Sequence, residues 1–228
     1  MQYELLPAYI LHSRPFQEDK LLLQLLLPEL GRLSAVIRKR QGKQRYALQP
    51  FQLFGVVLSG RTELKTIRTL DELAPACIFS GKVLFSALYV NELICRIWPD
   101  NQAAEQLFQV YRHTLQQLNE VEQQQNGLLE PCLRQFEFSL LQELGLQVDW
   151  QQDATGNLLQ PQYYYQWQDG EGFVRAASGW TGQQLLSIGQ QQWQQQGVSL
   201  AAKQLSRKLL APLLGDKPLL SRSLFSQT

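Results

Sequence analysis

The side chains best suited to chemistry in this chain are the cations of one short segment. Residues 38–45, Arg-Lys-Arg-Gln-Gly-Lys-Gln-Arg, hold five cations and no acid. The chain of 228 residues has a formal net charge of only +1, so the segment is a local concentration of positive charge. Lysine and arginine neutralise phosphates and release condensed counterions, which suits a nucleic-acid backbone. The alternative is a solvated loop beside core aromatic residues.

Charge is distributed unevenly along the rest of the chain. Residues 1–70 contain 11 Lys+Arg and 5 Asp+Glu, whereas residues 71–150 contain 4 and 11. Residues 151–228 contain 6 and 4. This division predicts one surface for a polyanion and a different surface for another partner.

Arg134 is a second informative cation, because it is the only one between Arg112 and Arg175. It lies among apolar residues on a predicted helix, where a lone arginine could bind a carboxylate in an apolar groove. Alternatively, it pairs with Glu137 or Glu130 on the same helix. The residues alone leave both alternatives open.

Few residues are arranged for catalysis. Neither His12 nor His113 lies in a metal-binding spacing, and the chain contains no nucleophile elbow and no phosphate-binding loop motif. The neighbouring carboxylates at 18–19 and 71–72 point to divergent sides of an extended chain. We therefore expect a binding protein without cofactor rather than an enzyme. The alternatives are a metal-dependent nuclease and a helical adaptor that does not bind DNA.

Composition indicates a globular protein with 44% hydrophobic residues. No apolar run reaches the roughly 18 residues that would span a bilayer, and the amino terminus does not resemble a signal peptide. We therefore expect a cytoplasmic protein without membrane contact. Cys77, Cys95 and Cys132 are too few and too widely spaced for a disulfide framework, so we expect them to be buried apolar side chains.

Five apolar or alternating runs in the first 70 residues predict short strands and a small barrel. They cover residues 5–12, 20–27, 32–37, 51–58 and 62–69, with Arg14-Pro15 ending the first strand. The basic segment joins the third and fourth strands. Nearby aromatic residues could stack on bases, although core packing is favoured for each: Tyr46, Phe51 and Phe54.

The remaining chain has helical periodicity. Helices are predicted over 80–98, 103–118 and 129–144, with Pro99 and Gly145 as stops, followed by a hairpin near 162–177. Thr181 and Ser199 are predicted to cap helices over 181–188 and 199–211, the last ending before Pro212. The predicted fold class is α+β, with a five-stranded barrel domain over 1–78 and a mostly helical domain over 79–228.

Motifs along nearly the whole chain resemble those of the RecO family of bacterial recombination mediators. Each is weak alone, but their order and spacing together are specific. They include Glu29-Leu30-Gly31-Arg32-Leu33, Gly60-Arg61-Thr62-Glu63-Leu64-Lys65-Thr66, Leu133-Arg134-Gln135-Phe136-Glu137 and Gly215-Asp216-Lys217-Pro218-Leu219. The resemblance implies an amino-terminal OB-fold and a helical carboxyl-terminal domain without enzymatic activity.

The resemblance also implies partners. RecO-like proteins bind single- and double-stranded DNA, anneal complementary strands and work with RecR to load RecA onto DNA covered by single-strand-binding protein, whose tail they bind. We predict DNA contacts by cations of the barrel: Arg14, Arg32, Arg38, Lys39, Arg40, Lys43, Arg45, Arg61 and Lys65. Arg134 matches a family arginine associated with the tail, and the predicted tail-binding residues are Arg134, Leu133, Phe136 and Arg112.

Many members of the resembled family carry a four-cysteine zinc site. The corresponding stretch here, residues 148–156, contains no cysteine. We therefore expect no metal, as in a zinc-free branch of the family. The expected location is the cytoplasm, in association with the nucleoid.

Overall fold

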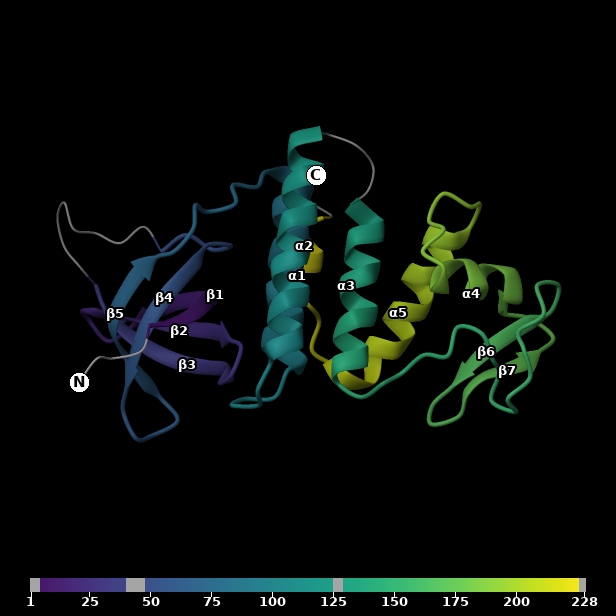
Figure 1. Cartoon of the computed structure of the whole chain (residues 1–228), viewed down its shortest axis with the longest axis horizontal. Coiled ribbons are helices and arrows are strands. Elements are labelled where there is room, and N and C mark those ends of the chain that lie inside the picture. The colour runs from purple at the N-terminus through teal and green to yellow at the C-terminus, as the bar shows by residue number, and fades with distance from the viewer. Residues whose placement is uncertain (1–4, 40–47, 125–128, 226–228) are drawn as a thin grey trace. The chain divides into compact units, whose positions relative to one another are not determined.

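The computed structural model of the chain describes residues 5–39, 48–124 and 129–225. They form two compact units, Met1–Leu129 with Lys217–Thr228 and Glu130–Asp216 (Figure 1). The first unit begins with a closed barrel, and the chain continues into helices and a small antiparallel sheet. This arrangement confirms the predicted fold class. The division into domains at residues 78 and 79 stays a prediction.

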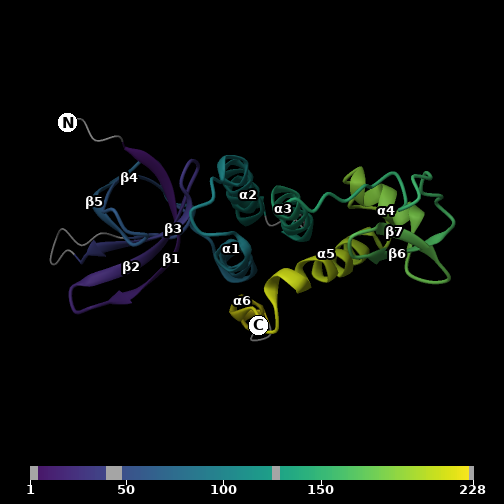
Figure 2. The same ribbon diagram turned by 90° about the horizontal axis from the view of Figure 1, so that it is seen from below.

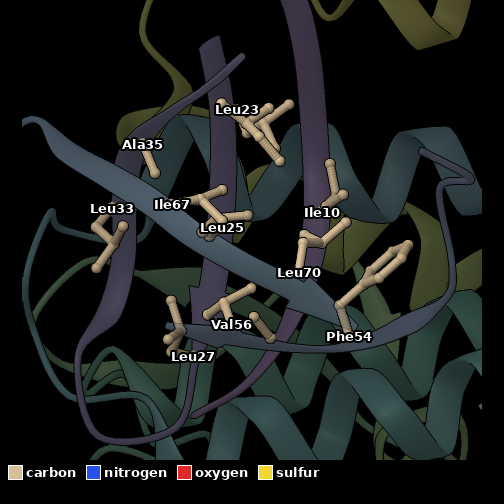
Figure 3. Packing of buried hydrophobic residues seen from close by; sticks show 12 residues of the cluster. Ile10, Leu23, Leu25, Leu27, Leu33, Ala35, Phe54, Val56, Ile67 and Leu70 are labelled. Atoms are coloured by element: carbon tan, nitrogen blue, oxygen red, sulfur yellow. The ribbon is translucent and has the colours of Figure 1, made fainter. Parts of the chain in front are cut away.

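The barrel has the strand order β1-β2-β3-β5-β4. Neighbouring strands are antiparallel except β3 and β5, which are parallel. Inward-facing side chains from all of these strands fill the interior with aliphatic residues and Phe54, as Figure 3 shows. The strands are β1 (Leu6–Phe16), β2 (Lys20–Leu27), β3 (Gly31–Arg38), β4 (Leu53–Ser59) and β5 (Lys65–Glu72).

Two strand boundaries differ from the prediction. β1 continues through Pro15 instead of ending there. In the described register β4 pairs only with Leu6–Tyr9, so the later part of β1 has a free edge where the missing proline N–H costs no ladder bond. β5 begins at Lys65 rather than residue 62, because residues 60–64 form the turn that follows β4.

The first unit also contains α1 (Gly81–Ile97), α2 (Glu105–Gln124) and α6 (Leu220–Leu224). α1 packs against β1, and Tyr9 of β1 makes ring contacts with Phe108 and Tyr111 of α2. α6 was not predicted from the sequence. It is held by Glu92 of α1, whose carboxylate accepts hydrogen bonds from the N–H groups of Leu220 and Ser221.

The second unit is built around α3 and α5, which lie beside a small sheet and α4. Apolar side chains of α4 and α5 pack against tryptophans and Phe138. The order β7-β6-β8 confirms the predicted hairpin. The elements are α3 (Leu129–Glu143), β6 (Tyr164–Gln168), β7 (Gly172–Ala176), β8 (Trp180–Thr181), α4 (Gly182–Gly189) and α5 (Val198–Leu214).

Helix ends in this unit were predicted in part. Thr181 caps α4 through a capping box, and Gly145 ends α3 in a left-handed conformation with φ of 89°. The predicted Ser199 cap is wrong, because Gly197 is the N-cap of α5 and Ser199 donates to Glu130 instead. The predicted stop at Pro212 is also wrong. α5 passes through this residue, since a proline near the end of a helix removes only one hydrogen bond.

The prediction that all three cysteines are buried is wrong for Cys77 and Cys95, which are half-buried. Cys132 is buried, and burial raises the pKa of the Cys95 thiol to about 12, so this thiol is unreactive at neutral pH. Within 5–39, 48–124 and 129–225, no helix combines the length and apolar character that crossing a bilayer requires.

Candidate nucleic-acid interface

The candidate interface is the outer face of β1, β2 and β3, which is the side turned away from the barrel core. Leu23 and Leu25 of β2 belong to the core, so Lys20, Leu22 and Gln24 point outward. Residues opposite one another on neighbouring strands share a face, which fixes the outward residues of β1 and β3. They are His12, Arg14 and Phe16 on β1, and Ser34, Val36 and Arg38 on β3.

Four cations gather at one end of this face, and we call them the cation row: Arg14, Lys20, Arg38 and Lys39. Lys20 is opposite Arg38 on one side and Phe16 on the other. Arg14, Arg38 and Lys39 are exposed. Figure 2 shows that the β1–β2 hairpin, to which Arg14 and Lys20 belong, extends away from α1 and α2. The basic segment predicted from the sequence begins at this same end.

The β1–β2 turn supplies two acceptors beside the cation row. Arg38 Nε donates to Asp19 Oδ2 at 2.7 Å, and the two side chains are 82% and 46% exposed. Lys39 Nζ donates to the main-chain carbonyl of Glu18 at 3.2 Å. An exposed ion pair contributes only about 0–1 kcal/mol. A phosphate can therefore replace Asp19 at Arg38 with little loss.

Arg32 is on the same face but at its opposite end, and its donors are occupied. It forms an ion pair of 3.0 Å with Asp100 and donates from Nε to the Trp98 carbonyl at 2.9 Å. Beside it, a Cβ added to Gly31, which has φ of 67°, would lie 1.7 Å from the Gln102 carbonyl oxygen. Arg32 thus holds β3 against the chain between α1 and α2. Its predicted contact with DNA stays a prediction.

Arg61 and Lys65 lie at the turn between β4 and β5, away from the cation row. β3 and β5 are parallel, and Lys65 is opposite Ala35, three residues before Arg38. Arg61 is exposed, whereas Lys65 is half-buried and donates to the Gly60 carbonyl at 3.4 Å. The structure therefore places Lys65 beside the middle of β3 rather than at its Arg38 end, so Arg61 and Lys65 are not part of the cation row.

Some predicted residues are not on this face. Arg40, Lys43, Arg45 and Tyr46 lie outside the described residues. Phe51 packs against Phe79, and Phe54 fills the barrel core. Neither Phe51 nor Phe54 presents its ring to a base.

Sequence reasoning missed Lys20 and Phe16 as members of the interface. Polar residues at positions 20 and 24 interrupt a run of leucines, which is a signal for an outward-facing row. That Lys20 joins Arg38 and Phe16 depends on the register of three strands. Register is set by turns and tertiary packing, so the pattern of one strand does not reveal it.

Arg134 is buried in the second unit. Its Nη2 lies 2.9 Å from Glu137 Oε1, and the two side chains are 6% and 1% exposed. Its Nη1 donates to Ser206 Oγ of α5 at 3.1 Å, while Nε has no hydrogen-bond partner among the described residues. The pair with Glu137, one of the two alternatives left open by the sequence, is therefore present.

The other predicted tail-binding residues differ in exposure. Leu133 and Phe136 are buried on α3, and Arg112 is exposed on α2 of the first unit. Among the described ion pairs, Glu130 is joined to Lys203, at 2.7 Å, and not to Arg134. The contact with Lys203, more than the nearby charge of Arg134, lowers the pKa of Glu130. A ligand carboxylate at Arg134 would compete with Glu137 for the guanidinium.

The stretch at 148–156 does not offer the ligands of a four-cysteine zinc site. Asp149 Oδ1 accepts from the N–H groups of Gln151 and Gln152, and Asp153 Oδ1 accepts from Thr155 and Asn157. Hydrogen bonds from Thr155 lower the pKa of Asp153 despite the opposing effect of desolvation. Among the residues that the structure describes, no group of three or more His, Cys, Asp or Glu is placed to hold a metal ion.

The chain is similar to known proteins along nearly its whole length. Residues 1–75 match the family model described as Recombination protein O N terminal, and residues 79–222 match Recombination protein O C terminal. A protein named DNA repair protein RecO from Stutzerimonas stutzeri is 40% identical over 96% of this chain and 92% of its own length. Proteins of the same name from Pseudomonas putida and Cellvibrio japonicus are 39% and 38% identical over 96% and 99% of this chain, and over 96% and 98% of their own lengths.

Proposed function

Because the chain belongs to the RecO family of DNA repair proteins, we propose that it is a DNA-binding recombination mediator. In this proposal it binds single- and double-stranded DNA and anneals complementary strands. With RecR, it helps load RecA onto DNA coated by single-strand-binding protein. It acts in the cytoplasm, on the nucleoid, without hydrolysing a nucleotide.

The cation row is the observation that carries the proposal. Arg14, Lys20 and Arg38 share one outward face, and Lys39 follows directly at the exposed end of β3. OB-folds bind oligonucleotides on the face of strands 2 and 3 and on the adjoining loops. Cations there bind phosphates and reduce the repulsion between two strands, which allows complementary bases to pair.

Phe16 gives the same face a stacking surface. It is half-buried and opposite Lys20, so its ring lies next to the phosphate-binding cations. Stacking of a base on an aromatic ring contributes about 1–3 kcal/mol and tolerates any base. We expect Phe16→Ala to weaken binding of single-stranded DNA more than binding of duplex DNA, in which the bases are already stacked.

A salt titration tests the cation row. We expect the combined change Arg14→Gln, Lys20→Gln and Arg38→Gln to weaken binding of single-stranded DNA. The slope of log K against log salt should become less steep by about 2, or about 0.7 for each phosphate that is no longer neutralised. A matched control removes the same charge from exposed cations elsewhere, through Lys82→Gln, Arg207→Gln and Lys217→Gln. Equal slopes in the two variants would remove the cation row from the proposal.

The cations of the basic segment are tested separately. Changing Arg40, Lys43 and Arg45 to alanine, together with Arg38 and Lys39, should weaken DNA binding and reduce its salt dependence. An unchanged affinity and slope would exclude the segment, including Arg38 and Lys39 of the cation row, and would leave only Arg14 and Lys20 to be judged by the other variant.

Strand annealing distinguishes the functional classes. Complementary labelled strands should anneal faster with the protein than without it, both as naked DNA and when coated by single-strand-binding protein. Cleavage of DNA by pure protein in magnesium would instead support a nuclease. Failure to shift DNA on a gel even at low salt would support a helical adaptor.

The predicted tail contact at Arg134 needs a variant that preserves folding. Replacing a buried ion pair with apolar residues of similar volume is often neutral or stabilising. We expect Arg134→Met combined with Glu137→Leu to keep the fold and naked-DNA binding but to lose binding of the tail peptide of single-strand-binding protein. Tail binding of normal affinity by this folded variant would argue against a role for Arg134.

A further inference from the structure

β1 contains a bulge at Leu11, three residues before Arg14 of the cation row. Ile10 is opposite Leu25 and His12 is opposite Gln24, so β2 provides no residue opposite Leu11 in the described ladder. A bulge leaves the extra residue without its ladder bonds, and a buried carbonyl without a partner is costly. Leu11 is buried, so its carbonyl needs a donor from outside the sheet.

Asn91 of α1 supplies that donor. Its Nδ2 donates to the Leu11 carbonyl oxygen at 2.9 Å, and its Oδ1 accepts from the Tyr111 hydroxyl of α2 at 2.7 Å. Asn91 and Tyr111 are both buried, and Tyr111 also packs edge-on against Tyr9 of β1. Two helices thus converge on one carbonyl of the barrel through a fully buried polar pair.

The bulge determines which way Arg14 points. Ile10 is in the barrel core, and in a regular strand residues 12 and 14 would face the same side as residue 10. The extra residue reverses this alternation, because a shift of one residue moves every later side chain to the other face. As a result His12 and Arg14 point outward, and Arg14 joins Lys20 and Arg38 in the cation row.

We infer that Asn91, fixed by Tyr111, is a positioning residue for DNA binding. It stabilises the bulge at Leu11 and thereby places Arg14 on the outer face. This inference rests on the proposed DNA-binding function, but its structural part can be tested without DNA.

A double-mutant cycle tests the coupling. Asn91→Leu keeps the number and branching of the side-chain heavy atoms but removes the donor to Leu11. We expect it to weaken binding of single-stranded DNA and to make the salt slope about 0.7 less steep, the same change as Arg14→Gln. Adding Arg14→Gln to Asn91→Leu should then weaken binding no further. If Arg14→Gln weakens binding equally in both backgrounds, Asn91 does not position Arg14.

Two further variants test whether weaker DNA binding reflects only a loss of stability. Ser86→Ala is the matched control, because Ser86 is buried on α1 but bonds only to the Lys82 carbonyl of its own helix in the described contacts. It should leave DNA binding unchanged. Tyr111→Phe removes only the hydroxyl that fixes Asn91, and it replaces Asn91→Leu if that variant does not fold. A folded Tyr111→Phe variant with unaltered coupling to Arg14 would overturn the inference.

A cross-linking experiment separates this inference from the proposed function. Arg14 and Leu22 are opposite one another on the outer face, so thiols introduced by Arg14→Cys and Leu22→Cys should form a disulfide with a mild oxidant. Peptide mass spectrometry distinguishes this disulfide from products of the natural cysteines. Adding Asn91→Leu should lower its yield at least several-fold, because residue 14 then faces the other side of β1. A lower yield combined with no DNA binding by the natural chain would support the positioning role and reject the proposed function. An unchanged yield would reject the positioning role whatever the DNA result.

Discussion

Two arginine–carboxylate pairs in different regions of the molecule have nearly the same length but different surroundings. Arg38 and Asp19, on the barrel, are 2.7 Å apart and largely exposed. Arg134 and Glu137, in the second unit, are 2.9 Å apart and almost fully buried. The two pairs therefore differ in their exposure to solvent and not in their length. An exposed pair exchanges its carboxylate for a phosphate at little cost, whereas breaking a buried pair leaves a charge without compensation.

Arg32 and Asp100 are intermediate between these extremes. They are 3.0 Å apart, with side chains 15% and 59% exposed. The arginine also donates to the Trp98 carbonyl, so its role is to hold β3 in place. The three pairs form a series in which the same chemistry changes from a contact that a ligand could replace at little cost to a structural contact as burial increases.

The largest expected effect is at the buried pair. Arg134→Ala should lower the free energy of unfolding by about 3–5 kcal/mol, because it leaves Glu137 buried without its guanidinium and opens a gap beside Ser206. Urea unfolding followed by tryptophan fluorescence measures this change. The paired variant Arg134→Met with Glu137→Leu should restore most of the stability. A decrease below about 1 kcal/mol for Arg134→Ala would show that water reaches the pair and would remove the contrast.

A smaller decrease in stability is expected at Arg32. Arg32→Ala removes a charged donor from the Trp98 carbonyl and should cost about 1.5–3 kcal/mol, the usual value for a hydrogen bond to a charged group. Thermal or urea unfolding measures it. Arg32→Lys is the control, since it keeps the charge but not the planar fork that reaches two acceptors. A change in the salt slope of DNA binding by folded Arg32→Ala protein would show that this arginine contacts phosphate as well.

The comparison also shows what local sequence could predict. Apolar periodicity predicted the strands and the main helices, and the Thr181 capping box and Gly145 were visible as residue patterns. The spacing around Arg134 left open a groove for a carboxylate and a pair with either Glu137 or Glu130. The choice depends on Lys203, which takes Glu130 from 73 residues further along the chain. The bulge at Leu11 was invisible for the same reason, because Asn91 is 80 residues away.

At the exposed pair of Arg38 and Asp19, we expect a substitution to strengthen DNA binding rather than to destabilise the fold. Asp19→Asn removes the carboxylate that competes for Arg38 and repels nearby phosphates, so DNA affinity should increase by up to about fivefold. Stability should change by no more than about 1 kcal/mol. Fluorescence anisotropy with labelled single-stranded DNA at low salt measures the affinity, and Glu29→Gln, at the far turn of the barrel, is the control. Weaker DNA binding by Asp19→Asn would mean that Asp19 holds Arg38 in its binding position.

Glu92 is a further carboxylate, and it is held mainly by neutral donors. Of the groups in this series, it should change stability the least when it is protonated, and only around α6. Burial raises its pKa, but hydrogen bonds from Ser221 and Leu220, with the charge of Arg96, outweigh burial and lower it below the ordinary value of 4.5. Because the pKa of Glu92 is lower in the folded protein than in the unfolded chain, its contribution to stability is complete at a pH above the ordinary value of 4.5. That contribution is lost as the pH falls through the lowered pKa. Amide hydrogen exchange at residues 220–221 should therefore lose protection in acid before β1 and β2 do. Glu92→Gln should remove this pH dependence, and simultaneous loss of protection in α6 and the barrel would show that the helix is not held locally by Glu92.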